Sequence, residues 1–130
     1  MKPTVFFVDD DTFLLDMYSL KFSKSGYDVK VSTSPDDALK KIREGFIPDI
    51  LLLDVVMPGM DGIEMLGVIR KEKLIPSTVI IMLTNQSSSQ DIERAKNFGV
   101  DGYITKAATI PSEVLAHVDE IYKRVKASKQ

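Results

Sequence analysis

The sequence predicts an α/β fold in which five parallel strands form a doubly wound sheet with five helices on its two faces. Apolar runs of strand length recur five times, and stretches of helical period lie between them. Three of these runs are apolar without alternation, which is typical of strands covered on both faces. Strict alternation of strand and helix, joined by right-handed crossovers, then favours the doubly wound arrangement.

The strands are defined by these apolar runs. The first, third and fourth contain the uninterrupted segments VFFV, ILLL and VIIML. The expected ranges, in chain order, are residues 4–8, 28–32, 49–53, 78–83 and 102–105.

The first two helices are marked by their ends as well as by their period. The first begins near Thr12 and stops at Gly26. The second has Ser34 as its N-cap and proline at its first position, and it ends at Gly45. Asp37 follows Ser34 by three residues, which resembles a capping box with aspartate in place of glutamate.

The last three helices are predicted from apolar spacing. The third covers about residues 62–73, the fourth ends at Gly99, and the fifth follows Pro111 and runs to about residue 127. The residues of the fourth helix expected to face inward are Ile92, Ala95 and Phe98.

Composition limits the class of protein. A chain of 130 residues predicts one domain, with an ordered core over about residues 4–127. Apolar residues make up 44% and charged residues 28%, as in ordinary soluble proteins, and cysteine is absent. With its net charge of -2, the chain has no overall positive charge that would attract nucleic acid or anionic lipid. No apolar stretch is long enough to span a bilayer. We therefore expect a cytoplasmic domain that binds neither nucleic acid nor membrane directly.

Two of the apolar strands end in carboxylates. Asp9, Asp10 and Asp11 follow the first strand directly, and Asp54 closes the third. Like charges that are buried together repel, and burying them is costly unless something neutralises them. Helix capping explains one such aspartate but not both strand ends. If the two strands are neighbours, their ends form an oxygen-rich site suited to Mg2+.

Two more polar residues occupy equivalent places. Thr84 and Lys106 lie at or just after the ends of the fourth and fifth strands. In doubly wound sheets, ligands bind outside the carboxyl ends of the strands. The sequence therefore predicts a site at this edge, formed by Asp9, Asp10, Asp54, Thr84 and Lys106.

Five motifs occur in an order and spacing that resemble the receiver domain of bacterial two-component response regulators, particularly its single-domain, chemotaxis-regulator type. They are Val8-Asp9-Asp10, Leu53-Asp54, Met57-Pro58-Gly59-Met60-Asp61-Gly62, Leu83-Thr84 and Tyr103-Ile104-Thr105-Lys106. The resemblance covers essentially the whole chain. It implies a flavodoxin-like receiver topology with strand order 2-1-3-4-5.

The resemblance also implies the chemistry of the site. Asp54 is then the phosphoacceptor, which receives a phosphoryl group from a phosphohistidine of a sensor histidine kinase or phosphotransfer protein. Asp9 and Asp10 bind Mg2+ together with Asp54, and the backbone carbonyl of Val56 adds an oxygen. Lys106 pairs with a phosphoryl oxygen. A domain of this family is a signalling domain that assists its own phosphorylation and dephosphorylation, rather than an enzyme acting on a separate substrate.

The resemblance further implies a switch. Thr84 donates its hydroxyl to a phosphoryl oxygen, and Tyr103 changes rotamer as Thr84 moves. This alters the face formed by the fourth helix, fifth strand and fifth helix, where an output partner or a second copy binds. The sequence departs from the family pattern at Ala107, which replaces the usual proline, and at Asn85, where a small residue is common.

Several other residues have a structural interpretation. Asp11 is expected to cap the first helix, and Asp61 to serve the turn before the third. His117, the sole histidine, is expected at a partly exposed helix position. The basic end of the chain, residues 123–129, is expected to be a solvated helix terminus.

Three alternative functions fit parts of this pattern. A flavodoxin-like cofactor binder is disfavoured because three carboxylates occupy the place of a phosphate-binding loop. An aspartyl-phosphate phosphatase carries the motif D-x-D-x-T/V, but Phe13 stands at its last position when Asp9 is its first. The third alternative is a receiver-like binding module that does not switch, and Asp54, Lys106 and Thr84 argue against it.

Overall fold

The computed structural model describes residues 3–84, 89–106 and 110–128, and within them it has the predicted fold. The strands are β1 (Thr4–Val8), β2 (Asp28–Ser32), β3 (Ile50–Leu53), β4 (Val79–Thr84) and β5 (Gly102–Thr105). The helices are α1 (Thr12–Lys24), α2 (Pro35–Arg43), α3 (Gly62–Lys71), α4 (Ser89–Asn97) and α5 (Pro111–Ser128). All strand pairs are parallel, and the order β2-β1-β3-β4-β5 confirms the predicted topology.

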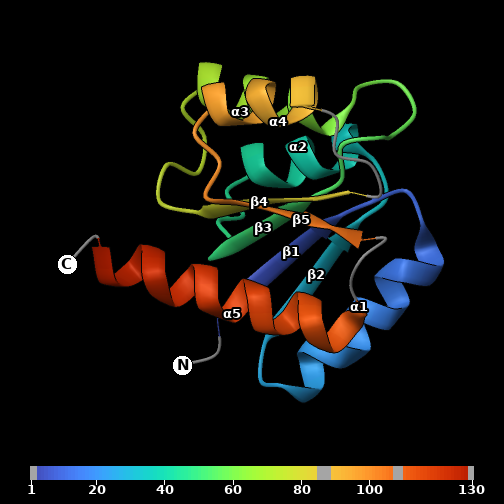
Figure 1. Ribbon diagram of the computed structural model, residues 1–130. Helices are drawn as coiled ribbons and strands as arrows, with labels where there is room; N and C mark the ends of the chain where they lie inside the picture. Colours follow the sequence, from blue (N-terminus) through green and yellow to red (C-terminus); the bar gives the residue numbers. More distant parts are fainter. Residues whose placement is uncertain (1–2, 85–88, 107–109, 129–130) are drawn as a thin grey trace.

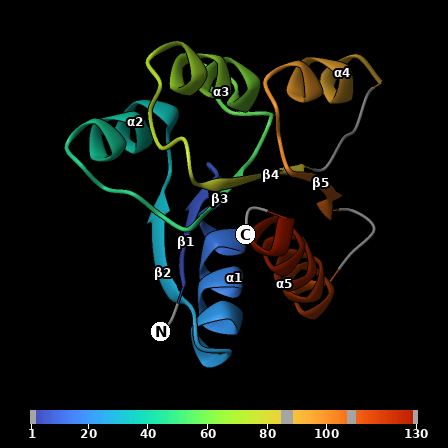
Figure 2. The same cartoon turned by 90° about the vertical axis from the view of Figure 1, so that its left-hand side faces the viewer.

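The helices form one layer on each side of the sheet. Helices α2, α3 and α4 cover one face, and α1 and α5 cover the other (Figures 1 and 2). Alternate residues of each central strand enter different layers: Phe6 packs with the α2–α4 side, whereas Val5 and Phe7 pack with the α1–α5 side. Every residue of β3 and β4 is buried. Burial on both faces explains why these runs lack alternation.

The end of helix α4 packs against α3, a contact that the sequence does not predict. Within α4, Ala95 is fully buried as expected, but Ile92 is only partly buried, and Phe98, just beyond the helix, is 38% exposed. The Phe98 ring lies over Gly67 of α3, where an added Cβ would be 3.3 Å from it. The guanidinium of Arg70 donates to the carbonyls of Phe98 and Gly99, at 2.7 and 3.1 Å. The inward placement predicted for Phe98 is therefore wrong, because its ring packs on α3. Ile92 is partly buried and lines a pocket with Gly102 and Tyr103 of β5, so that prediction holds in part.

The capping prediction for α2 is half right. The Ser34 hydroxyl accepts a hydrogen bond from the backbone N–H of Asp37, as expected. The carboxylate of Asp37 does not return to Ser34. It accepts a hydrogen bond from Ser32 and pairs with Lys41, 3.0 Å away.

Among residues 3–84, 89–106 and 110–128, none of the helices has the length and apolar character that a membrane span requires.

Helices α1, α2 and α3 end in the same hydrogen-bond pattern, in which a left-handed residue follows the last turn. The left-handed residues after α1 and α2 are Gly26 and Gly45, whereas Lys73 (φ 56°) stands in this position after α3. Leu74 N–H donates to the carbonyl of Ile69 and Lys73 N–H to that of Arg70, which completes the motif. A non-glycine residue in this conformation is disfavoured by about 1–2 kcal/mol.

We predict that Lys73→Gly stabilises the domain by about 0.5–1 kcal/mol. The substitution removes left-handed strain, and the greater freedom of glycine in the unfolded chain offsets part of that gain. Urea unfolding measures the difference. Lys71→Gly, two residues earlier inside α3, is the matched control and should destabilise by up to about 1 kcal/mol. A lower free energy of unfolding for Lys73→Gly would contradict the assignment of strain to this residue.

Candidate functional site

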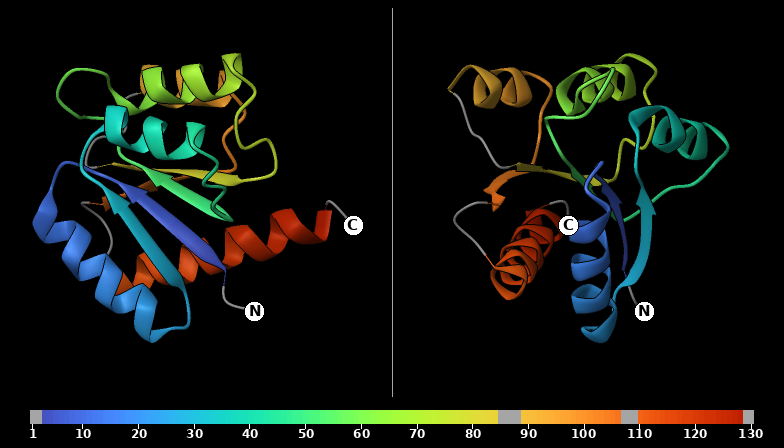
Figure 3. Two further views of the ribbon diagram at one scale, coloured as in Figure 1. Left: turned by 180° about the vertical axis from the view of Figure 1, so that it is seen from behind. Right: turned by 90° about the vertical axis from the view of Figure 1, so that its right-hand side faces the viewer.

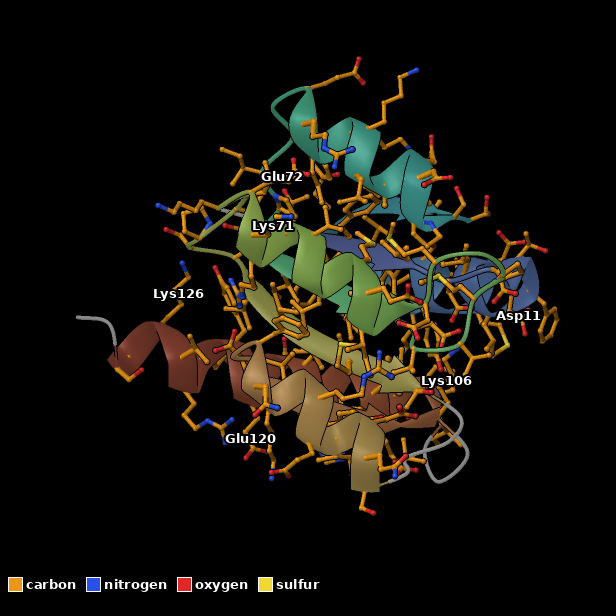
Figure 4. The ribbon with its side chains drawn as sticks, turned by 90° about the horizontal axis from the view of Figure 1, so that it is seen from above. Asp11, Lys71, Glu72, Lys106, Glu120 and Lys126 are labelled. Carbon is orange, nitrogen blue, oxygen red and sulfur yellow. The ribbon has the colours of Figure 1, made fainter. Side chains whose placement is uncertain are left out.

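The carboxyl ends of the strands form a polar pocket with a volume of about 420 Å³. It is lined by Asp9, Asp10, Asp11, Asp54, Val56, Thr84 and Lys106. Figure 3 shows β1 leading into the start of α1 at this edge. Figure 4 shows Asp11 and Lys106 at the same end of the molecule, with Lys71 and Glu72 at the opposite end. The structure thus brings together the five residues that the strand ends supply.

Asp9 and Asp54 are held side by side by the sheet. β1 and β3 are neighbours, with Val8 paired to Leu53, so the residues that follow them leave the sheet together. The Asp54 N–H donates to the Val8 carbonyl at 3.0 Å, and the Asp9 N–H donates to the Ser32 carbonyl at 3.1 Å. Asp9 is 5% exposed and Asp54 7% exposed. Two carboxylates that repel each other are therefore fixed in a poorly solvated place.

Lys106 is the buried cation of this cluster. Its ammonium forms a hydrogen-bonded ion pair with Oδ2 of Asp9 and lies 3.6 Å from Oδ2 of Asp54. The side chain is almost fully buried, so the pairing is screened far less than at a surface. Three carboxylates, including Asp10, against one ammonium leave the cluster with a formal charge of 1 − 3 = −2.

The electrostatics of the site raise the pKa of Asp54 to about 6. Burial is the largest cause, and the charges of Asp9 and Asp10 act in the same direction. The Lys106 ammonium and a backbone hydrogen bond from Val56 lower the pKa and offset part of the rise. The field extends to α1, where burial and then the charges of Asp9, Asp11 and Asp54 raise the pKa of Tyr18.

The carboxylates fit a divalent cation. Asp9, Asp10 and Asp54 each offer an oxygen, and these atoms lie within 4.8 Å of one another. Asp9 and Asp54 are buried, whereas Asp10 is exposed. Carboxylate oxygens are the ligands that Mg2+ prefers, and its two charges balance the cluster. Val56 lines the same pocket, and its backbone carbonyl as a further ligand stays a prediction.

Two neighbouring aspartates have capping roles. Asp11 is the N-cap of α1, and its carboxylate accepts from the N–H groups of Phe13 and Leu14 at 3.1 and 3.2 Å, as expected. Asp61 is the N-cap of α3 and forms a reciprocal capping box with Glu64. The prediction of a turn residue missed this role, although aspartate followed three residues later by glutamate resembles a capping-box signature.

The remaining predicted residues divide between the described and undescribed parts of the chain. Thr84 is buried at the end of β4, and Tyr103 on β5 is half-buried. The Tyr103 hydroxyl is buried and has no hydrogen-bond partner among the described residues. His117 is exposed on α5 and is not among the pocket-lining residues. Asn85 and Ala107, the two departures from the family pattern, lie outside the described residues.

Known proteins resemble the chain in sequence and in structure. The family model of the response regulator receiver domain matches residues 5–119. The chain is 36% identical over 124 residues to the alkaline phosphatase synthesis transcriptional regulatory protein PhoP of Bacillus subtilis, a match covering 95% of this chain and 50% of PhoP. It is 35% identical over 118 residues to the DNA-binding response regulator MtrA of Mycobacterium tuberculosis, with 91% of this chain and 50% of MtrA covered. The chain thus spans about half the length of these curated relatives.

A solved structure shows the same likeness over the whole fold. It is a CheY-like response regulator receiver domain protein from Methanospirillum hungatei, which superimposes with a TM-score of 0.88 at 28% identity. The match covers 98% of this chain and 99% of that one.

We predict that Asp54→Asn stabilises the metal-free domain at neutral pH and flattens its pH dependence. Because the pKa of Asp54 is raised from 3.8 to about 6 in the folded state, folding favours its protonated form. This contribution is fully present below about pH 4 and is lost as the pH rises through about 6. Asparagine has no charge to bury at any pH.

Urea unfolding in chelator, between pH 4 and pH 8, measures this effect. Asp16→Asn, at an exposed position of α1, is the control for loss of one surface carboxylate. If Asp54→Asn and wild type lose stability in parallel as the pH rises, the account of Asp54 is wrong.

Proposed function

The chain belongs to the response regulator receiver domain family, and we propose that about residues 4–127 act as one phosphoacceptor domain with Asp54 as the phosphorylated residue. Receiver domains are signalling domains of two-component systems. The observation that carries the proposal is Asp54 itself, a buried carboxylate beside Lys106 at a pocket that three further carboxylates line. The phosphodonor is a phosphohistidine of a sensor histidine kinase or phosphotransfer protein.

In the proposed reaction, an oxygen of Asp54 attacks the phosphorus of the phosphohistidine. An O–P bond forms, the P–N bond breaks, and the imidazole leaves with the electron pair and takes up a proton from water. The product is an acyl phosphate on Asp54. Mg2+ held by Asp9, Asp10 and Asp54, with the carbonyl of Val56, supplies charge neutralisation for the phosphoryl oxygens when it is bound.

Lys106 serves this reaction before and after transfer. In the unphosphorylated domain its ammonium lies 3.6 Å from Oδ2 of Asp54 and holds that carboxylate beside Asp9. After transfer, the same ammonium pairs with an oxygen of the phosphoryl group, which carries about two negative charges where the carboxylate carried one. The domain therefore assists its own phosphorylation and dephosphorylation and is not an enzyme for a separate substrate.

Thr84 and Tyr103 form the proposed switch. Thr84 ends β4 at the pocket, and its hydroxyl donates to a phosphoryl oxygen after transfer. The register pairs Thr84 with Thr105 and places Tyr103 two residues earlier on β5. Burial, and then the charges of Asp91 and Asp54, raise the pKa of Tyr103. An unpartnered buried hydroxyl costs about 1–3 kcal/mol, which keeps a second rotamer close in energy.

Three large apolar side chains are exposed at positions that are close in the sequence to pocket-lining residues. Phe13 is 70% exposed in the first turn of α1, Val56 is 64% exposed on the pocket wall, and Ile110 is 59% exposed just before α5. A phosphodonor must approach Asp54 at this edge, and apolar side chains are common in contact surfaces. We assign them to contact with the donor.

The output face is proposed to be α4, β5 and α5, where Tyr103 lies. Its ligand is an output protein or a second copy of the domain. MtrA is by name a DNA-binding regulator, and this chain spans half of it. Because the net charge of these 130 residues is -2, we assign no direct nucleic-acid contact to them.

We predict that acetyl phosphate with Mg2+ adds one phosphoryl group to the wild-type domain and none to Asp54→Ala. Mass measurement of the intact proteins, followed by peptide mapping, locates the group. The modification should require Mg2+ and should hydrolyse as an acyl phosphate does. Thr105→Ala is the control for a nearby hydroxyl and should be modified like wild type. A stable, acid-resistant phosphothreonine would overturn the assignment to Asp54.

We also predict that a phosphate mimic such as beryllofluoride changes the environment of the output face. Amide shifts in NMR should move at Asp54 and Lys106, and also at Tyr103 and along α4 and α5. Tyr103→Phe should reduce the distant shifts and leave those at the site in place. Shifts confined to the loops around Asp9 and Asp54 would favour a module that does not switch, while leaving the phosphoacceptor chemistry intact.

A further inference from the structure

The first residue of α3 is packed against the main chain of Asp54. A Cβ added to Gly62 would lie 1.9 Å from the carbonyl oxygen of Asp54 and 2.8 Å from its carbonyl carbon. The Gly62 N–H also donates to the carbonyl of Val55 at 2.8 Å. The start of α3 is therefore in direct contact with the backbone of Asp54 and Val55.

Space, and not backbone conformation, requires glycine at this position. Gly59, in the same loop, has a φ of 78° and nothing within 4 Å of its added Cβ, so its requirement is conformational. Gly62 is not among the residues of positive φ. A side chain at Gly62 is excluded chiefly by the main chain of Asp54, and the added Cβ would also lie 3.2 Å from Cγ of Leu53.

The helix cannot easily withdraw to make room. Asp61 accepts from the Glu64 N–H at 2.7 Å, and the Glu64 carboxylate accepts from the Asp61 N–H at 3.1 Å. Just behind this capping box, Ile63, Met65 and Leu66 are buried in the core. Moving α3 away would break these core contacts, so a side chain on Gly62 also strains the backbone of Asp54.

We infer that Gly62, held by the capping box of Asp61 and Glu64, is a positioning residue for Asp54. The backbone N–H of Asp54 is held by its hydrogen bond to the carbonyl of Val8 in β1. The backbone carbonyl of Asp54 is held by its contact with Gly62 of α3. Between these two supports, the carboxylate stays 3.6 Å from Lys106 and within reach of Asp9 and Asp10. This inference rests on the proposed function, because it concerns how the phosphoacceptor is held.

The size of the effect follows from the distance. Real Cβ atoms essentially never approach another atom closer than 3.0 Å, so the contact at 1.9 Å must open by more than 1 Å. A misplacement of about 1 Å at a reacting group costs about 100-fold in rate.

The first experiment compares Gly62→Ala with Gly67→Ala, the same substitution in the same helix. At Gly67 the added Cβ meets the ring of Phe98 at 3.3 Å, a contact that a shift of a few tenths of an ångström relieves, and that ring is partly exposed. We measure unfolding in urea, Mg2+ affinity by titration, and the rate of phosphorylation by acetyl phosphate. A folded Gly62→Ala domain should be phosphorylated about 100-fold more slowly and bind Mg2+ more weakly, and Gly67→Ala should match wild type. Wild-type affinity and rate in folded Gly62→Ala would overturn the inference.

A second pair of variants decides the matter if Gly62→Ala does not fold. Glu64→Ala removes half of the capping box at an exposed position, and Glu64→Gln keeps an acceptor that can complete it. The inference expects a several-fold slower rate and weaker Mg2+ binding for Glu64→Ala, with both restored in Glu64→Gln. Equal values in the two variants would overturn it. If wild type and Gly67→Ala are not phosphorylated at all, the proposed function fails, while the Mg2+ affinities still test the positioning of Asp54.

Discussion

The buried charge cluster of Asp9, Asp54 and Lys106 is the constraint on which the rest of the site depends. Two carboxylates are fixed at the ends of adjacent strands, and one ammonium from the far edge of the sheet contacts both. A buried carboxylate without a partner is strongly unfavourable. The parallel order of the strands brings the cluster together. Hydrophobic burial on both faces stabilises β3 and β4, which carry Asp54 and Thr84 at their ends.

The residual charge of this cluster connects structure to function. With Asp10 included, the carboxylates outnumber the ammonium by two, which favours a divalent cation. Burial raises the pKa of Asp54, and the charges of Asp9 and Asp10 add to that rise. Phosphorylation changes both the charge and the number of acceptor oxygens at this point. Thr84 ends β4 and Lys106 directly follows β5, and both line the pocket, so the proposed response passes through those strands to Tyr103.

Much of this arrangement could be predicted from the chain. The runs VFFV and ILLL predict buried strands, and the aspartates that follow them predict a shared site once parallel pairing is assumed. The strand order came from resemblance to a family, because local periodicity does not say which strands are neighbours. Asp11 as a helix cap was also predictable from its place before an amphipathic stretch.

Other features depend on contacts between distant segments and were missed. Periodicity placed Phe98 on the inward face of its helix, but Gly67 and Arg70 of α3 provide a different surface for it. Gly62 looks in sequence like another turn glycine, and only the position of Asp54 shows that space is what it provides. The pairing of Lys106 with Asp9 joins residues 97 apart in the sequence.

Thermal unfolding with Mg2+ and with chelator, at equal ionic strength, tests most directly whether this cluster requires a counter-cation. A cation that binds only the folded domain stabilises it by mass action, by about 2.7 kcal/mol at a concentration 100 times its Kd. The account predicts a higher melting temperature with Mg2+ for wild type and little or no increase for Asp10→Ala, which loses one oxygen ligand. Equal melting temperatures for wild type in Mg2+ and in chelator would contradict it.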